Sequence, residues 1–162
     1  MTKDYDLALA KHHRKLRIVT VPLISWGLFP VCTNEISVFN YVQKYWKIKE
    51  DFDSIVQQSK KSILVTNTDF EIIFASNNIL EMNGYNPFEI IGKSPKIFQG
   101  ELTSSLTTKQ IRKAIKQRKP FKEILLNYKK DGSIYLCEIE AFPKFNQKGE
   151  FINYIAFEKI AS

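Results

Sequence analysis

The chain has 162 residues, 44% of them hydrophobic and 25% charged, which suits one globular domain with an extension and excludes a low-complexity chain. Its net charge of +7 would favour acidic partners, but the lysines are scattered along the sequence, so we expect no nucleic-acid binding. Cys32 and Cys137 lie far apart without metal-ligand spacing, which indicates free thiols of a cytoplasmic protein and no metal site.

Residues 1–33 combine a basic start with the most apolar window of the chain, residues 18–32. This window is shorter than the about 20 apolar residues that a membrane-spanning helix needs, and Pro22, Gly27 and Pro30 interrupt it. No small-residue cleavage site follows, which argues against a secretory signal peptide. We therefore expect an extended segment that packs on the domain or on a second copy, without a membrane anchor.

Residues 34–46 and 51–59 are predicted to be helical. Their apolar side chains recur at helical spacing, with a broad apolar face in the first segment and Phe52, Ile55 and Val56 in the second. An apolar face of this width needs a surface to bury against. We therefore expect the two helices to form a cap on the rest of the chain.

A polar stretch that ends near Ser62 separates an N-terminal region, residues 1–59, from a main domain, residues 60–162. In the main domain, short β-rich runs bounded by turn residues predict strands at residues 63–66, 72–75, 121–129, 133–143 and 151–159. Residues 104–117 show helical periodicity, and Pro120 marks the end of that helix.

Three short helical turns are predicted between residues 76 and 100. Their expected starts are Ser76 or Asn77 as the first cap, Asn86 with Pro87 for the second turn, and Ser94 with Pro95 for the third. The apolar positions expected to face inward are Ile79, Leu80, Met82, Phe88, Ile90, Ile91, Ile97 and Phe98.

The run formed by residues 84–100, GYNPFEIIGKSPKIFQG, resembles the centre of a PAS domain. Within that family it is most similar to the flavin-binding light-oxygen-voltage (LOV) group, whose motif is roughly G-R-N-C-R-F-L-Q-G. The matching positions are Gly92, Gln99 and Gly100. Lys96 stands where the group has arginine, and Pro95 stands where it has the cysteine that bonds to the photoexcited flavin.

This resemblance spans about residues 60–160 and includes the run L-N-Y-x-K-D-G near Asn127. It implies an α+β PAS fold, with a five-stranded antiparallel sheet, short helices on one face and an N-terminal helical cap. In PAS proteins such caps cover the sheet or make the dimer contact. We therefore expect a charge introduced at Phe39 or Trp46 to shift a dimer toward monomer.

Alternation along the strands selects the side chains that face the interior. In the fourth strand, Glu138 and Glu140 favour an outward face, which leaves Tyr135, Cys137, Ile139 and Ala141 on the inward one. The resemblance agrees, since it places Cys137, Ile139 and Ala141 toward a ligand. The same reasoning turns these residues of the third and fifth strands inward: Leu125, Asn127, Tyr154, Ala156 and Glu158.

The flavin contacts of the LOV group carry over in part. Gln99 matches, Arg112 stands at the position of a phosphate-binding arginine, and Asn127 matches an amide that binds the flavin ring. The departures are Ser94, Pro95, Cys137 and Glu158. The candidate cofactor-binding residues are therefore Ser94, Lys96, Phe98, Gln99, Arg112, Asn127, Cys137, Ile139, Ala156 and Glu158.

Glu158 is the sharpest departure, because an ionised carboxylate in an apolar cavity must find a cation or a proton. We expect Arg112, Lys96 or a cationic or hydrogen-bond-donating ligand to pair with it. Three interpretations of the interior stay open: a packed core without a cofactor, a small molecule other than flavin, and flavin mononucleotide (FMN) held without adduct chemistry.

The resemblance implies a sensory and signalling module that acts by protein–protein interaction, through the cap, the sheet or a homodimer. The alternative is a LOV-like flavin-binding photoreceptor or redox sensor that forms no cysteinyl adduct. The sequence has no nucleophile–base pair, phosphate-cradling glycine loop or metal cluster, so we expect no enzymatic activity. Because the chain ends at Ser162, just after the last predicted strand, we expect its output in trans.

Overall fold

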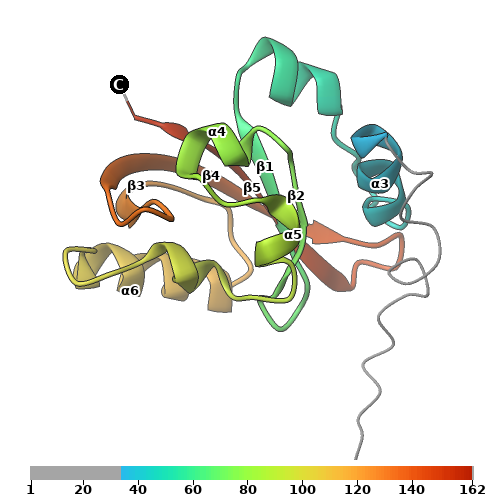
Figure 1. Ribbon diagram of the computed structural model, residues 1–162. Helices are drawn as coiled ribbons and strands as arrows, with labels where there is room; N and C mark the ends of the chain where they lie inside the picture. The colour runs from blue at the N-terminus through green and yellow to red at the C-terminus, as the bar shows by residue number, and fades with distance from the viewer. Residues whose placement is uncertain (1–33, 162) are drawn as a thin grey trace, which may run out of the picture. The chain divides into compact units, whose positions relative to one another are not determined.

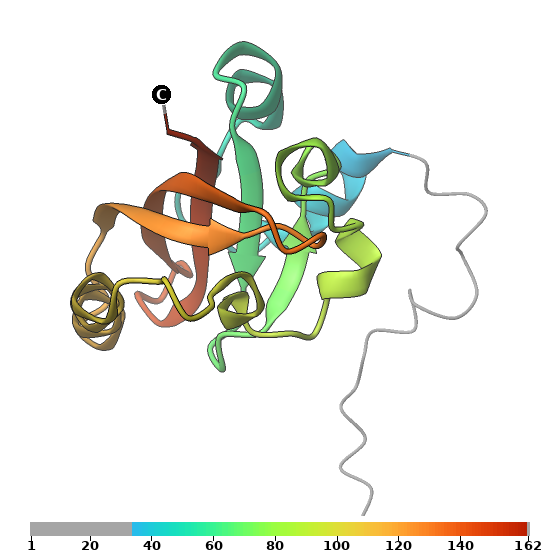
Figure 2. The same ribbon diagram turned by 60° about the vertical axis from the view of Figure 1, so that its left-hand side comes forward.

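Five antiparallel strands form one sheet in the order β2-β1-β5-β4-β3 (Figure 1). The computed structural model describes residues 34–161, so the predictions for residues 1–33 lie outside it. The strands are β1 (Ser62–Thr66), β2 (Ile72–Ala75), β3 (Phe121–Tyr128), β4 (Ile134–Phe145) and β5 (Phe151–Ile160). In the turned view of Figure 2, β1 lies between β2 and β5. This sheet confirms the predicted antiparallel arrangement and all of its strands.

Three polar turns connect the neighbouring strands. Asn67 begins the β1–β2 turn, and its Oδ1 accepts hydrogen bonds from the backbone N–H groups of Asp69 and Glu71, each at 2.9 Å. Asn146 makes the same arrangement between β4 and β5, where it accepts from Lys148 and Glu150 at 2.9 and 3.0 Å. Asn and Asp side chains favour turns because they can bond their own backbone two residues on. The predicted turn chemistry is therefore confirmed.

Four of the described helices lie on one face of the sheet: α4 (Ile79–Asn83), α5 (Pro87–Ile90), the 3-10 helix η2 (Pro95–Phe98) and α6 (Ser105–Lys116). Asn86 caps α5 by accepting from the Phe88 N–H, and Glu89 returns the bond by accepting from the Asn86 N–H, both at 3.0 Å. Ser94 caps η2. These caps satisfy N–H groups that a helix start leaves free, as predicted.

The inward positions of these short helices were predicted correctly only in part. Ile79, Met82, Ile90 and Phe98 are buried, whereas Leu80, Phe88 and Ile91 are exposed. A helix of about one turn can point only one or two side chains at the sheet, so adjacent apolar residues cannot all be buried. The predicted cap of α4 was also wrong: Ser76 instead accepts a hydrogen bond from the Ile63 N–H at 2.7 Å, and no side chain caps this helix.

The opposite face of the sheet is covered by α3 (Glu35–Val42) and the π-helical turn η1 (Ser54–Gln58), which form the predicted cap. Phe39 is 0% exposed and Trp46 is 1% exposed, and the Phe39 ring lies 5.2 Å from the Phe74 ring, centroid to centroid. Both side chains therefore belong to a hydrophobic core within the subunit. The expectation that either makes a dimer contact was wrong, because neither reaches the surface.

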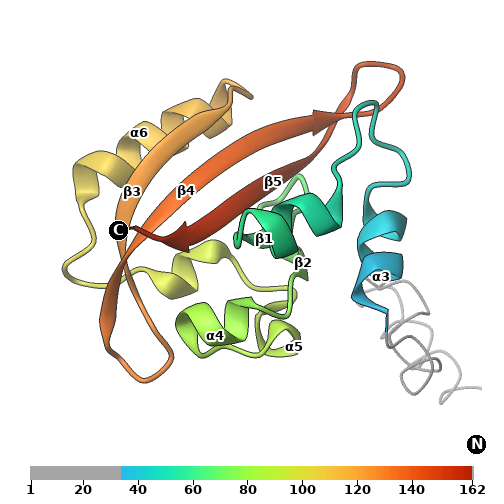
Figure 3. The ribbon, with the colours of Figure 1, turned by 90° about the horizontal axis from the view of Figure 1, so that it is seen from above.

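Hydrogen bonds tie the cap to the sheet. Trp46 Nε1 donates to Asn153 Oδ1 at 2.8 Å, and Asn153 Nδ2 donates to the Thr66 carbonyl at 3.0 Å. The Lys47 N–H donates to the Phe145 carbonyl at 2.8 Å. The segment that follows α3 accordingly runs beside the tip of the β4–β5 hairpin (Figure 3). These bonds connect the cap directly to β4 and β5, and through Asn153 to β1.

Replacing Phe39 by alanine should lower the free energy of unfolding by about 3–5 kcal/mol, because the change leaves a cavity in a fully buried aromatic cluster. Tyr41→Ala on the same helix is the matched control, since Tyr41 is 55% exposed and its loss should change stability by about 0.5 kcal/mol or less. Urea unfolding measures both. Equal destabilisation by the two changes would contradict the burial of Phe39.

Candidate functional site

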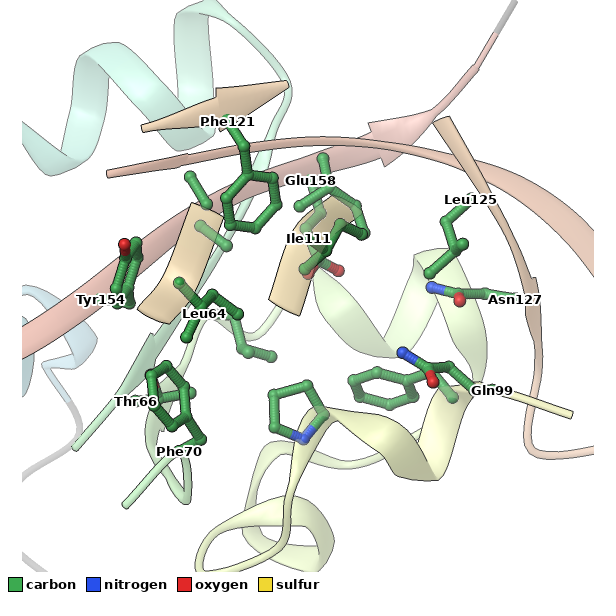
Figure 4. Close-up of a pocket in the computed structure, with 16 residues that line it drawn as sticks. Leu64, Thr66, Phe70, Gln99, Ile111, Phe121, Leu125, Asn127, Tyr154 and Glu158 are labelled. Atoms are coloured by element: carbon green, nitrogen blue, oxygen red, sulfur yellow. The ribbon is translucent and has the colours of Figure 1, made fainter. Parts of the chain in front are cut away.

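A cavity of about 100 Å³ lies between the inner face of the sheet and the helices η2 and α6 (Figure 4). Every strand except β2 contributes to its wall, and the β1–β2 turn closes one side with Phe70. The lining residues are Leu64, Thr66, Phe70, Pro95, Phe98, Gln99, Ile111, Ile115, Phe121, Leu125, Asn127, Ile139, Ala141, Tyr154, Ala156 and Glu158. The wall is mostly apolar, with a few polar groups, which is the usual character of a ligand pocket.

Gln99 is held at the cavity by the residue that follows it. A Cβ atom on Gly100 would lie 2.5 Å from Tyr128 Cε2, so only glycine allows the chain to pass this close to the ring. The Tyr128 hydroxyl accepts a hydrogen bond from the Leu102 N–H at 3.0 Å, which fixes the ring in place. The structure therefore explains why glycine follows Gln99: Gly100 leaves room for the Tyr128 ring, and Gln99 faces the cavity.

Two buried polar atoms of the wall have no hydrogen-bond partner among the described residues. They are Thr66 Oγ1 and Asn127 Oδ1. Leaving a buried donor or acceptor unpaired costs about 1–3 kcal/mol, and native proteins contain few such groups. The cavity therefore presents hydrogen-bonding capacity that the described protein groups do not use.

Glu158 brings a carboxyl group into the same cavity, from β5. Its side chain is buried, and Cys137 Sγ approaches Glu158 Oε2 at 3.8 Å. Burial raises the pKa of Glu158 to about 7, and the weak bond from Cys137 opposes that shift only in part. Burial also raises the pKa of Cys137, whose thiol is free and protonated in this surrounding. The Glu158 carboxyl is therefore poised between its neutral and ionised forms near neutral pH.

The expected pairing of Glu158 with Arg112 or Lys96 was wrong. Neither cation forms an ion pair with it in residues 34–161, and both are exposed. On α6, Ile111 and Ile115 point at the cavity one turn apart, which turns Arg112 away from it. On η2, Pro95 and Phe98 face the cavity and Lys96 lies between them on the outer side.

Six of the ten predicted site residues line the cavity, Cys137 and Ser94 lie next to it, and Lys96 and Arg112 are exposed. Those that line the cavity are Phe98, Gln99, Asn127, Ile139, Ala156 and Glu158. Cys137 lies behind the wall and touches Glu158, while Ser94 caps η2. Sequence reasoning missed Thr66, although it shares a strand face with Leu64 and alternation could have placed it there. It also missed Phe121, which alternation places on the same face of β3 as Leu125 and Asn127, and Phe70, which lies in a turn and carries no comparable pattern.

Residues 34–161 contain neither a membrane-spanning helix nor a metal cluster. Each helix in this range is too short or too polar to cross a bilayer. No three His, Cys, Asp or Glu side chains in the same range are grouped so that they could hold a metal ion.

A sheet of this order with a ligand-sized cavity under its helices defines a sensory domain of the PAS class. The sequence model of the PAS domain matches residues 60–159, and the chain belongs to that family. The dark structure of the blue-light photoreceptor Aureochrome1 LOV superposes with a TM-score of 0.62 at 26% identity, covering 72% of this chain and 89% of that one. The resemblance to PAS domains and their LOV group is thereby confirmed.

Curated relatives carry the same domain within longer chains. Protein TWIN LOV 1 of Arabidopsis thaliana is 36% identical over 88 residues, which is 54% of this chain and 22% of that protein. Phototropin-2 of Oryza sativa subsp. japonica is 32% identical over 109 residues, 67% of this chain and 12% of that protein. The human voltage-gated inwardly rectifying potassium channel KCNH3 is 30% identical over 92 residues, 56% of this chain and 8% of that protein. The matched part thus spans about a fifth or less of each relative.

FMN, which the LOV relatives suggest as a ligand, would need a larger cavity than this structure has. Pockets for ligands of its size enclose about 300–1,000 Å³, whereas this one encloses about 100 Å³. Aromatic rings of Phe70, Phe98 and Phe121 occupy part of the wall. The amides of Gln99 and Asn127 lie together on one side (Figure 4), but the buried carboxyl of Glu158 faces the same space. The donor set therefore suits a smaller ligand.

Replacing Glu158 by glutamine should stabilise the protein at pH 8 by about 3 kcal/mol and change little at pH 4. The folded-state pKa of about 7 exceeds the unfolded value of 4.5, so wild-type stability falls as the pH rises between these values. Above pH 7 the whole cost of the buried charge is present, and glutamine removes it. Urea unfolding across this pH range measures the difference.

Glu138→Gln is the control for this experiment. Glu138 lies on the outer face of β4, where the ammonium of Lys122 lowers its pKa. A lowered pKa adds stability at pH values above the unfolded-state pKa, so Glu138→Gln should weaken the protein slightly at pH 8. The fall in stability between pH 4.5 and 7 that Glu158 causes should remain. A wild-type profile that stays flat between pH 4.5 and 7 would refute the assignment to Glu158.

Proposed function

We propose that this chain is a sensory module that binds a small molecule in its cavity and signals by protein–protein interaction. The observation that carries the proposal is the unused hydrogen-bonding capacity of the cavity at Thr66 Oγ1, Asn127 Oδ1 and the Glu158 carboxyl. A packed core without a ligand would keep this cost permanently, at about 1–3 kcal/mol for each unpaired group. A ligand that pairs with these groups removes it.

Binding rather than catalysis is proposed for this cavity. Of the residues that line it, only Tyr154 and Glu158 are ionisable. The Tyr154 hydroxyl donates to the Lys119 carbonyl at 3.0 Å, and burial raises its pKa, so it is a poor base or nucleophile near neutral pH. The free thiol of Cys137 is consistent with a reducing compartment, and we propose that the protein acts in the cytoplasm.

The route from cavity to cap that we propose runs through β1 and β5. Thr66 faces the cavity, its carbonyl accepts from Asn153 Nδ2, and Asn153 Oδ1 accepts from Trp46 in the cap. A ligand that bonds Thr66 Oγ1 would therefore act on a strand whose backbone is tied to the cap by two buried hydrogen bonds. The domain division that we propose places this output region in residues 1–59 and the sensor in residues 60–162.

Tyr45 and Ile48, just after α3, are the proposed partner-binding surface of the cap. Both are large apolar residues exposed on the cap, where a partner could cover them. We expect Ile48→Glu to reduce self-association of the full chain in sedimentation velocity. Leu102→Glu, an exposed control in the segment before α6, should leave it unchanged. Self-association that survives Ile48→Glu would exclude this surface as the contact between copies.

A flavin function is the second candidate, favoured by the paired amides of Gln99 and Asn127 and by the LOV relatives. The two functions differ at Arg112, which is exposed and could reach only a ligand that extends out of the cavity, such as one with a phosphate group. For a small enclosed ligand, Asn127→Ala should reduce occupancy while Arg112→Ala leaves it unchanged. For FMN, both changes should reduce it.

Native mass spectrometry of the purified protein and of the two variants measures this occupancy, with an absorption spectrum of each sample. We expect a bound mass well below that of FMN, lost in Asn127→Ala and kept in Arg112→Ala, and no flavin bands in the blue. Flavin bands, or a ligand lost equally in both variants, would reject the small-ligand function in favour of the flavin one. A protein that carries no ligand and binds no added FMN would refute both.

A further inference from the structure

The only charged side chain in the wall of the cavity belongs to Glu158, among the residues that the structure describes. It is 4% exposed, and no described lysine, arginine or histidine lies within ion-pair distance of it. Apart from Cys137 Sγ at 3.8 Å, its surroundings are apolar or uncharged. A buried carboxylate is stable only when it is paired with a cation or protonated.

We propose that the cavity binds a small organic cation of the amine, amidine or guanidine class, whose positive charge pairs with the Glu158 carboxylate. This inference rests on the proposed function, which requires only that the cavity hold some small molecule. It adds the charge and chemical class of that molecule, and it gives Glu158 the role of charge-pairing residue.

The other groups of the wall suit a ligand that donates several hydrogen bonds. Thr66 Oγ1 and Asn127 Oδ1 can both accept, and neither has a partner among residues 34–161. Figure 4 shows the Glu158 carboxyl near the middle of the cavity, with Asn127 and Gln99 on one side and Thr66 on the other. An amidinium or guanidinium group carries N–H donors in several directions from one charged centre, so it can meet acceptors on opposite walls.

Aromatic rings complete the surroundings of this cation. Phe70 and Tyr154 lie 5.9 Å apart, centroid to centroid, and both line the cavity, as do Phe98 and Phe121. The faces of such rings attract cations, and the attraction is stronger where water is excluded. A neutral ligand would gain apolar contact from the same rings but would leave the carboxylate unpaired.

Size restricts the ligand to a few heavy atoms. The cavity of about 100 Å³ is smaller than the about 150 Å³ at which an apolar cavity accepts benzene. Methylguanidinium is of suitable size and stays charged at all relevant pH values. N-Methylurea has nearly the same shape and no charge, so the two compounds differ chiefly in the property under test.

The pH dependence of binding provides an independent signature. The titratable groups that interact with Glu158 are Cys137 and Tyr135 from β4, while Tyr154 from β5 lines the same cavity, and burial raises the pKa of each. The lining residues from β1, β3, η2 and α6 carry no charge. Glu158 is therefore the group that ionises in this range, and methylguanidinium should bind more tightly as the pH rises through the pKa of about 7 and then level off.

The experiment is a titration of the full chain with methylguanidinium and with N-methylurea, followed by the amide NMR signals of β1 and β5. At pH 8 we expect methylguanidinium to bind about a hundredfold more tightly than N-methylurea. Glu158→Gln should remove that preference, because the charge partner is lost while the shape of the side chain is kept. Glu138→Gln on the outer face of β4 should retain it.

Each other result overturns the inference. Equal or tighter binding of N-methylurea would show that the cavity takes a neutral ligand, and the proposed sensory function would survive. A preference that persists in Glu158→Gln, or is independent of pH, would remove Glu158 from the site. If neither compound binds, the organic-cation class is rejected, and the mass of the ligand carried by the purified protein decides separately whether the cavity holds any molecule.

Discussion

The alternation of side chains along β1 and β5 is the constraint on which the rest of this domain depends. On β1, Leu64 faces the ligand cavity while Ile63 and Val65 lie in the core beneath the cap. On β5, Glu158 faces the cavity while Ile155 lies under the cap. Because the period is two residues, a slip of one residue would exchange the two sets and expose the cap to a carboxylate. The register of β1 and β5 therefore determines both which side chains line the cavity and which pack under the cap.

In this arrangement, the state of Glu158 affects the stability of the whole fold. Native domains are stable by only about 5–15 kcal/mol, so an ionised Glu158 without a partner consumes a considerable part of that margin. A molecule that pairs with it stabilises the folded chain in proportion to its occupancy. The strands that line the cavity beside Glu158, β1 and β5, also carry Ile63, Val65 and Ile155 against the cap. Under the proposed function, the ligand and the cap would therefore act on the same two strands, which the Asn153 side chain joins to Trp46.

The sequence was sufficient for the sheet because its signals are local. Short β-rich runs bounded by turn residues located the strands, and Asn67 and Asn146 specified two of the turns by bonding the adjacent backbone. The one-turn helices gave no period to interpret, so Leu80 and Phe88 were placed inside although both are exposed. Whether Arg112 could pair with Glu158 depended on the rotation of α6 about its axis and on the space left between side chains. Both are properties of three-dimensional packing, and no short-range pattern encodes them.

Family membership and cavity chemistry are therefore set by different residues. Gly100, which belongs to the motif that resembles the LOV group, lets the Tyr128 ring pass close to the chain and so shapes the backbone around the cavity. Under the proposed function, by contrast, the ligand would be chosen by a few inward positions on β3 and β5, above all Asn127 and Glu158. Changing one of these from an amide to a carboxyl leaves the packing of the sheet intact but changes which molecule can be desolvated beside it. A protein can thus keep the architecture of its family while its cavity favours a cationic ligand in place of one that carries a phosphate group.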